Sequence, residues 1–234
     1  MNLKDKLAFF SKHSLSEDTR LRIKEENNRD SYSDEDSFTP PEFRDIAQVA
    51  LAGYFGVCCG RKNIKVHPTC VEFYYHEEAE DGIKDYIVYH RNPKNSSEDK
   101  LKSIFSLGIL HHHVSGIDIT FEHGSCPEDA VRASMLIREF WVEGEDKPDN
   151  RSTLLYDALY SQTSVFDGFS IKWVDGEKEI EVASSVRKNV AKYDGNAQKL
   201  LAKEHQDLIN EKGFSCTEDK KYIQDPRKWQ FKKV

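Results

Sequence analysis

The chain has 234 residues, of which 38% are hydrophobic and 32% are charged, and its formal net charge is −7. This length predicts one domain with one core, and the content of apolar and aromatic residues excludes a disordered protein. No stretch approaches the roughly 18 apolar residues of a membrane span, and the N-terminus lacks the apolar segment of a signal peptide, so we expect a cytoplasmic protein. The acidic charge excludes a surface that attracts nucleic acid everywhere, although it leaves room for a local basic groove.

The first 38 residues differ in composition from the rest. Residues 14–38 are polar, dense in charge and poor in apolar side chains, so burial cannot repay the entropy of ordering them. We therefore predict a flexible charged leader over residues 1–38, with a short helix at Leu3–Phe10, followed by a folded domain over residues 39–234.

A helix opens the folded part. Thr39 is a good N-cap, the two prolines after it suit a first turn, and Glu42 stands at the capping-box position. Apolar residues then recur at helical spacing to about Tyr54, and Gly56 follows as a stop signal.

Short segments rich in β-branched and aromatic residues come next and predict a predominantly antiparallel sheet. The predicted strands are Asn63–Val66, Cys70–Tyr75, Tyr86–Tyr89, Gly108–His113, Ile117–Phe121, Ser134–Val142, Ser170–Val174 and Glu179–Val182. Helices are predicted at Ser152–Tyr160 and Asn196–Lys212. The fold class is therefore α+β.

Several segments follow one another as the blocks of one known family do. Cys70-Val71-Glu72-Phe73-Tyr74 resembles the family strand T-E-A-Y, and Arg91-Asn92 resembles its R-N pair. Gly108 to His113 resembles the strand G-x-x-Y-V-Y, and Ile117 to Thr120 resembles the strand with the pocket asparagine. Met135-Leu136-Ile137-Arg138 resembles the strand V-L-I-R, Leu154 to Leu159 resembles the helix after it, and Glu181 to Arg187 resembles the late A-S-x-R segment. The chain thus resembles the alkyladenine (3-methyladenine) DNA glycosylases from residue 39 to about residue 190.

This resemblance implies a fold and a set of site residues. The fold would be a curved, predominantly antiparallel sheet flanked by helices, as in these glycosylases and in the C-terminal domain of formyltransferases. Glu72 would be the catalytic carboxylate with Arg138 beside it. The base pocket would be formed by Tyr74, His111, His113 and Asp118, and the contacts to nucleic acid would come from Arg91, Asn92, Arg151 and Arg187.

The chemistry fits the residue types. Hydrolysis of an N-glycosidic bond needs a carboxylate that activates water and stabilises an oxocarbenium-like sugar, and Glu72 is the candidate. On an alternating strand, Glu72 and Tyr74 face the same side, where a flipped base could stack. We expect a monomer that acts on DNA, either a duplex with a flipped base or a single strand, without a cofactor.

Two departures from the family favour alternatives. The intercalating tip is shortened to Val114-Ser115-Gly116, and Asn150-Arg151-Ser152-Thr153 replaces the G-P-G-K turn. A non-catalytic nucleic-acid or nucleotide-binding protein on the same fold therefore remains open.

Two further segments, the histidine strand and the C-terminal tail, contain residue types that could bind a ligand. His111 and His113 share a strand face and could bind a metal in a hydrolase of another class, but spacing fixes no third ligand, so we expect no metal. The tail over residues 225–233 mixes basic and aromatic residues and is interpreted as a solvated terminal strand rather than a single-strand contact.

Overall fold

The computed structural model describes residues 1–27, 38–60, 62–85, 88, 104–113, 115–161, 163–164, 166–187 and 227–234. Its helices are α1 (Leu3–His13), α2 (Glu17–Asn27), α3 (Pro41–Ala50) and α5 (Leu155–Tyr160), the last preceded by the 3₁₀ turn η2 (Ser152–Leu154). Its strands are β1 (Tyr54–Cys59), β2 (Lys62–Glu77), β3 (Leu110–His113), β4 (Gly116–Thr120), β5 (Val131–Val142), β6 (Phe169–Val174), β7 (Val182–Ser185) and β8 (Gln230–Lys233).

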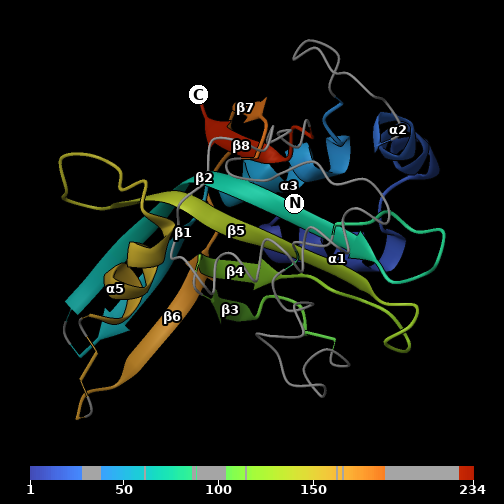
Figure 1. Cartoon of the computed structure of the whole chain (residues 1–234). Helices are drawn as coiled ribbons and strands as arrows, with labels where there is room; N and C mark the ends of the chain where they lie inside the picture. The colour runs from blue at the N-terminus through green and yellow to red at the C-terminus, as the bar shows by residue number, and fades with distance from the viewer. Residues whose placement is uncertain are drawn as a thin grey trace, which may run out of the picture.

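All eight strands form one curled antiparallel sheet that resembles half of a barrel (Figure 1). The order along its main path is β3-β4-β5-β2-β1-β6, and β8 pairs with both β2 and β7. The predicted α+β class with an antiparallel sheet is thereby confirmed. Among the described residues, no helix is long and apolar enough to cross a membrane.

Strand β2 organises the sheet, and it is one long strand where the sequence predicts two. It pairs with β5 on one side from Val66 to Glu77. On its other side it pairs first with β1 and then, from Cys70 to Glu72, with β8. The register against β5 shifts between Pro68 and Val71, where proline cannot donate a ladder hydrogen bond, so the strand bends where it changes partner.

Helix α3 ends at Ala50 instead of Tyr54 because the chain from Tyr54 onward pairs in the sheet. Tyr54–Cys59 form β1, a strand that was not predicted from the sequence, between β2 and β6. At the turn, a Cβ on Gly53 would lie 2.4 Å from Cζ2 of Trp173. Only glycine allows this close approach of the chain to the indole.

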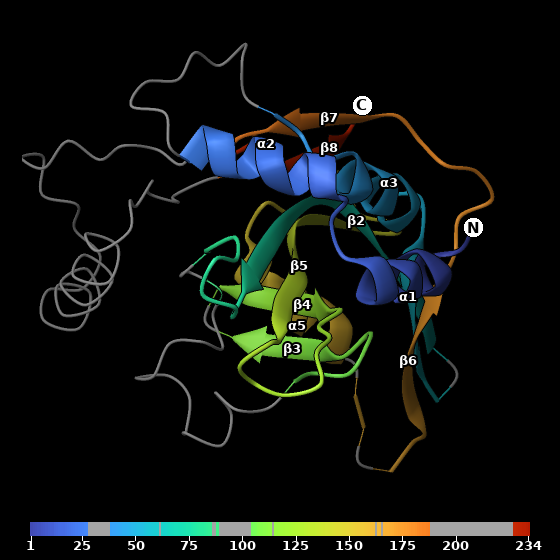
Figure 2. The same cartoon turned by 90° about the vertical axis from the view of Figure 1, so that its right-hand side faces the viewer.

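Helices α1 and α3 lie against the sheet (Figure 2). An aromatic core packs between these helices and one face of the sheet. Phe43 of α3 stacks on Phe73 of β2 with ring centroids 4.6 Å apart. Phe10 of α1 meets Tyr75 and Phe121 edge-on. Aromatic pairs in these geometries add to the free energy of burial, so α1 and α3 share the core of the sheet.

The predicted leader is in large part structured. The helix expected at Leu3–Phe10 is confirmed as α1. Residues 17–27 form the helix α2 where the sequence predicts a flexible segment, and residues 28–37 lie outside the described part. Leu3, Leu7, Leu15 and Ile23 are all buried. These few apolar side chains fit a core formed by the distant sheet, which composition alone does not reveal.

Two predicted elements cannot be compared. The helix at Asn196–Lys212 and nearly all of the strand at Tyr86–Tyr89 lie outside the described residues. The predicted helix at Ser152–Tyr160 is confirmed as η2 and α5 together.

Candidate functional site

The sheet has one apolar face and one polar face. Along β2, Phe73 and Tyr75 point into the aromatic core, and alternation directs Glu72 and Tyr74 to the opposite face. Glu72 lies opposite Leu136 of β5, and Leu136 lies opposite Asp118 of β4. Asp118 in turn lies opposite His111 of β3. Directly opposed residues share a face, so a row of side chains runs from Glu72 across β5 and β4 to His111 of β3. On its other side, Glu72 lies opposite Gln230 of β8.

Glu72 is held by two neighbours on this face. Arg138 of β5 donates from Nε to Oε2 at 3.0 Å and from Nη2 to Oε1 at 2.7 Å. The hydroxyl of Tyr74 donates to Oε1 as well, and Nη2 of Arg138 lies 3.3 Å from the same hydroxyl. The structure therefore brings together Glu72, Arg138 and Tyr74 as the sequence predicts.

Burial sets the electrostatics of this group. The side chain of Glu72 is fully buried, whereas one fifth of the Arg138 side chain is exposed. Burial, and next the nearby Glu72 carboxylate, raise the pKa of Tyr74 well above its ordinary value. Tyr74 therefore keeps its proton at neutral pH, and its hydroxyl can donate a hydrogen bond to Glu72. A carboxylate fixed in this way can accept a proton from water or stabilise positive charge.

Another side chain covers the ring of Tyr74, so a base cannot stack on that side of it. The guanidinium of Arg187 covers its ring at 5.2 Å from the centroid. Arg187 itself is fully buried and donates to Asp85 at 2.7 Å and to the carbonyl of Phe73 at 3.3 Å. A buried guanidinium paired with a carboxylate supports the fold, so Arg187 is not exposed as the predicted contact to nucleic acid would have to be.

A cluster around Arg187 was not predicted from the sequence. Arg227 lies 3.5 Å from Asp85, and the ring of Trp229 lies under both guanidinium groups, at 4.9 Å from Arg187 and 4.2 Å from Arg227. The tail is thus a terminal strand as predicted, but not a solvated one, since Trp229 and Phe231 are fully buried. The only signal was the mixture of arginine and tryptophan in the tail.

The histidine strand forms a second polar group. His113 Nε2 lies 3.0 Å from Oδ1 of Asp118, and the hydroxyl of Ser134 donates to Oδ2 of Asp118 at 2.9 Å. The ring of His111 stacks on that of His113 at 5.8 Å. One donor atom from each of His111, His113 and Asp118 lies within 4.8 Å of the others. The structure therefore brings three of the four predicted pocket residues together, and Asp118 supplies the third possible metal donor that spacing did not fix.

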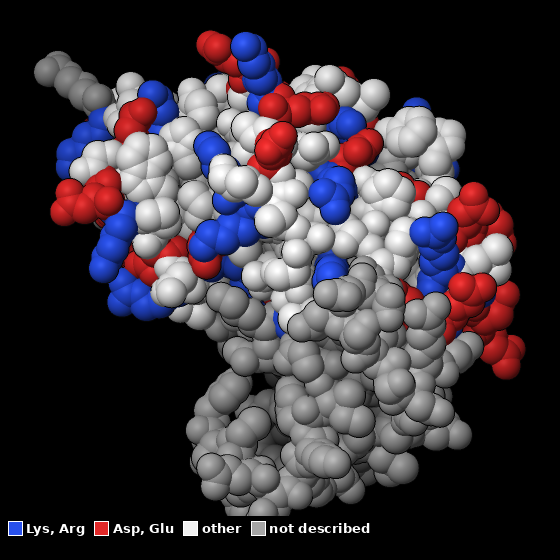
Figure 3. Space-filling model, turned by 90° about the horizontal axis from the view of Figure 1, so that it is seen from above, with Lys and Arg blue, Asp and Glu red and all other residues white. Residues whose placement is uncertain are grey.

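The remaining predicted contacts to nucleic acid divide into two groups. Arg91 and Asn92 lie outside the described residues. Arg151 is mostly exposed and donates from Nε and Nη2 to Asp149. Figure 3 shows acidic and basic side chains interspersed over one face of the molecule. The described charges on that face thus mix both signs.

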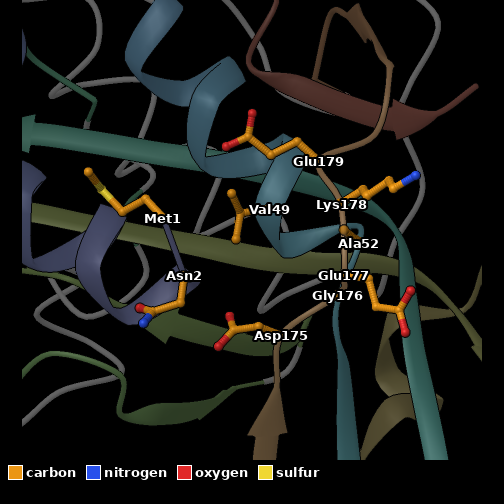
Figure 4. Close-up of a pocket in the computed structure, with 9 residues that line it drawn as sticks. All are labelled: Met1, Asn2, Val49, Ala52, Asp175, Gly176, Glu177, Lys178 and Glu179. Carbon is orange, nitrogen blue, oxygen red and sulfur yellow. The ribbon is translucent and has the colours of Figure 1, made fainter.

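A surface hollow lies between the N-terminal residues, the end of α3 and the segment after β6 (Figure 4). It is bordered by Met1 and Asn2 at the start of α1, by Val49 and Ala52 at the end of α3, and by residues 175–179 after β6. No predicted site residue lines it, and three of its lining residues are acidic. The backbone N–H of Leu3 donates to Asp175 here, so the hollow marks where α1 meets the sheet.

Comparison with known proteins yields no match to a protein-family model, to a curated protein or to a solved structure.

Proposed function

We propose that the chain is a monofunctional DNA glycosylase that hydrolyses the N-glycosidic bond of a damaged or modified base, with an alkylated purine as the first candidate. The proposed fold family is that of the alkyladenine DNA glycosylases. One observation carries the proposal: the fully buried Glu72 carboxylate receives hydrogen bonds from both Arg138 and Tyr74 on the polar face of the sheet. These residues also carry the sequence resemblance to that family.

In the proposed reaction, water attacks the anomeric carbon as the bond to the base nitrogen breaks. Glu72 takes the proton of the attacking water and stabilises the oxocarbenium-like sugar, and the base leaves with the bonding electrons. An alkylated purine cation leaves as a neutral base, so this substrate needs no general acid. Arg138 and the Tyr74 hydroxyl orient the carboxylate, and a flipped base would stack on another pocket wall because Arg187 covers the Tyr74 ring.

The test is base release from oligonucleotides that carry alkylated, deaminated or hypermodified bases, followed by mass spectrometry of the free base. We expect the wild type to release the base. The rate of release should be about 10²-fold or more lower in Glu72→Gln, because this is the typical contribution of a general base. Glu143→Gln is the control, because Glu143 pairs with Lys65 at an exposed position. Release that is equal in wild type and Glu72→Gln would contradict the role of Glu72.

A binding protein on the same fold is the second candidate. It is favoured by the bidentate pair itself, because a carboxylate held by an arginine and a tyrosine can be a purely structural element. The discriminating measurement is fluorescence anisotropy with single-stranded and duplex oligonucleotides at several salt concentrations. Salt-dependent binding without release of any base supports this second function and rejects catalysis.

A further inference from the structure

The strands β3 and β4 place three metal-binding side chains on one face. His111 lies directly opposite Asp118 in the register of the two strands. His113 is two residues further along β3, so it returns to the same face. The side chains of His113 and Asp118 are each only 4% exposed, and a donor atom of each of the three residues lies within 4.8 Å of the other two.

We propose that His111, His113 and Asp118 bind a divalent transition-metal ion such as Zn²⁺. Two imidazoles and a carboxylate are a ligand set of zinc sites that keep a position open for water, and imidazole suits the neighbouring divalent ions as well. Ligand atoms about 2.1 Å from a tetrahedral ion lie about 3.4 Å from one another. His113 and Asp118 already meet at 3.0 Å, so small side-chain rotations complete the site.

An outer contact orients one of the ligands, and a second contact holds His113 when no metal is bound. The Ser134 hydroxyl donates to Oδ2 of Asp118, which leaves Oδ1 directed toward His113, and such contacts typically fix ligands at metal sites. The backbone N–H of Ser115 donates to Nδ1 of His113, so without metal the ring proton is on Nε2. Metal at Nε2 moves that proton to Nδ1 and breaks the hydrogen bond from Ser115.

The metal site goes beyond the glycosylase proposal, and it gives to metal binding three residues that the resemblance assigns to the base pocket. Asp118 lies two strands away from Glu72 across the sheet, about 10 Å at the usual spacing of strands. A metal there would bind water or an anionic oxygen next to the Glu72 group. Its ligands would then hold the ion instead of forming the wall of a base pocket.

The experiment is a titration of untagged full-length protein, first dialysed against a chelator, with Co²⁺ and then with Zn²⁺. We expect one equivalent of Co²⁺ to produce a visible absorption band that Zn²⁺ abolishes. His111→Ala and Asp118→Asn should weaken binding by about 100-fold or more, at least the loss seen when outer-shell partners are removed. His112→Ala is the matched control, because the His112 ring faces away from the site and contacts Tyr156 and Tyr160.

A second readout keeps the test decisive if a variant folds poorly. An ion that binds the folded state raises the midpoint of thermal unfolding, so Zn²⁺ should raise the Tm of the wild type and of His112→Ala. Wild type that takes up no Co²⁺ and gains no Tm from Zn²⁺ overturns the site. Binding that is unchanged in His111→Ala and Asp118→Asn, or lost equally in His112→Ala, also overturns it. No DNA is present, so neither result decides the glycosylase question.

Discussion

Arg138 contacts both carboxylate oxygens of Glu72, at 3.0 and 2.7 Å, although the two residues are 66 positions apart in the chain. The contact forms because β2 and β5 pair along most of their length. It joins the two residues that the sequence assigns to catalysis, and it makes the stability of the sheet depend on a charged pair.

We predict that Arg138→Met lowers the free energy of unfolding by about 3 kcal/mol. The change leaves the buried Glu72 carboxylate without its cation, and breaking a buried pair costs about 3–5 kcal/mol. The lower end applies because Arg138 is partly exposed. Urea denaturation at pH 7 measures the effect. The double variant Glu72→Met/Arg138→Met should recover most of the loss, and a double variant no more stable than the single one would contradict this account.

The N-terminal helix α1 should behave as part of the core rather than as a leader. Leu7 is 2% exposed, so Leu7→Ala should destabilise the protein by about 2–5 kcal/mol, as other buried leucines do. Phe9 on the same helix is 59% exposed, and Phe9→Ala should change stability by less than about 0.5 kcal/mol. Thermal and urea unfolding compare the two variants. Equal, small effects would mean that α1 does not pack on the sheet.

Two glycines near the start of β1 should differ in how well they tolerate substitution by alanine. A Cβ on Gly53 would lie 2.4 Å from Trp173 and 2.7 Å from the carbonyl of Val174, whereas one on Gly56 would meet nothing closer than 3.6 Å. Gly53→Ala should therefore cost about 1–3 kcal/mol, the usual cost of overpacking, and Gly56→Ala should cost little. Urea unfolding of both variants checks this. A destabilised Gly56→Ala beside an unaffected Gly53→Ala would reverse the packing argument.

Acid should destabilise the protein partly through His123. Burial, the largest cause, lowers the pKa of His123, and its Nε2 lies 2.6 Å from the hydroxyl of Ser14 at the end of α1. Because the folded pKa is depressed, the unfolded chain binds more protons below the ordinary histidine pKa of about 6.5. The contribution is thus fully present above that pH and is lost as the pH falls toward the folded pKa.

The measurement is the free energy of unfolding between pH 7.5 and 5. We expect His123→Gln to show a flatter pH dependence than the wild type, by at most about 1.4 kcal/mol per pH unit for one proton. Burial also lowers the pKa of His67 and His112, so some dependence should remain. His13→Gln, at an exposed position on α1, is the control. A slope in His123→Gln as steep as in the wild type would contradict the assignment.

Local patterns in the sequence determined the kinds of element and the faces of the strands. The prolines and apolar spacing after Thr39 predicted α3, and alternation along residues 70–75 placed Glu72 and Tyr74 on one face. Both follow from periodicities of the backbone that neighbouring residues encode by themselves. The α+β class follows from the same signals.

Tertiary structure decided which of these faces meet. Arg187 and Asp85 are 102 positions apart, and no local period relates them, so the buried cluster over Tyr74 and Trp229 depends on the strand order. Asp118 became a third donor beside the two histidines only through the register of β3 and β4. Pairing energies and burial across the sheet act between distant residues, so composition could not show that α1 and α2 belong to the fold.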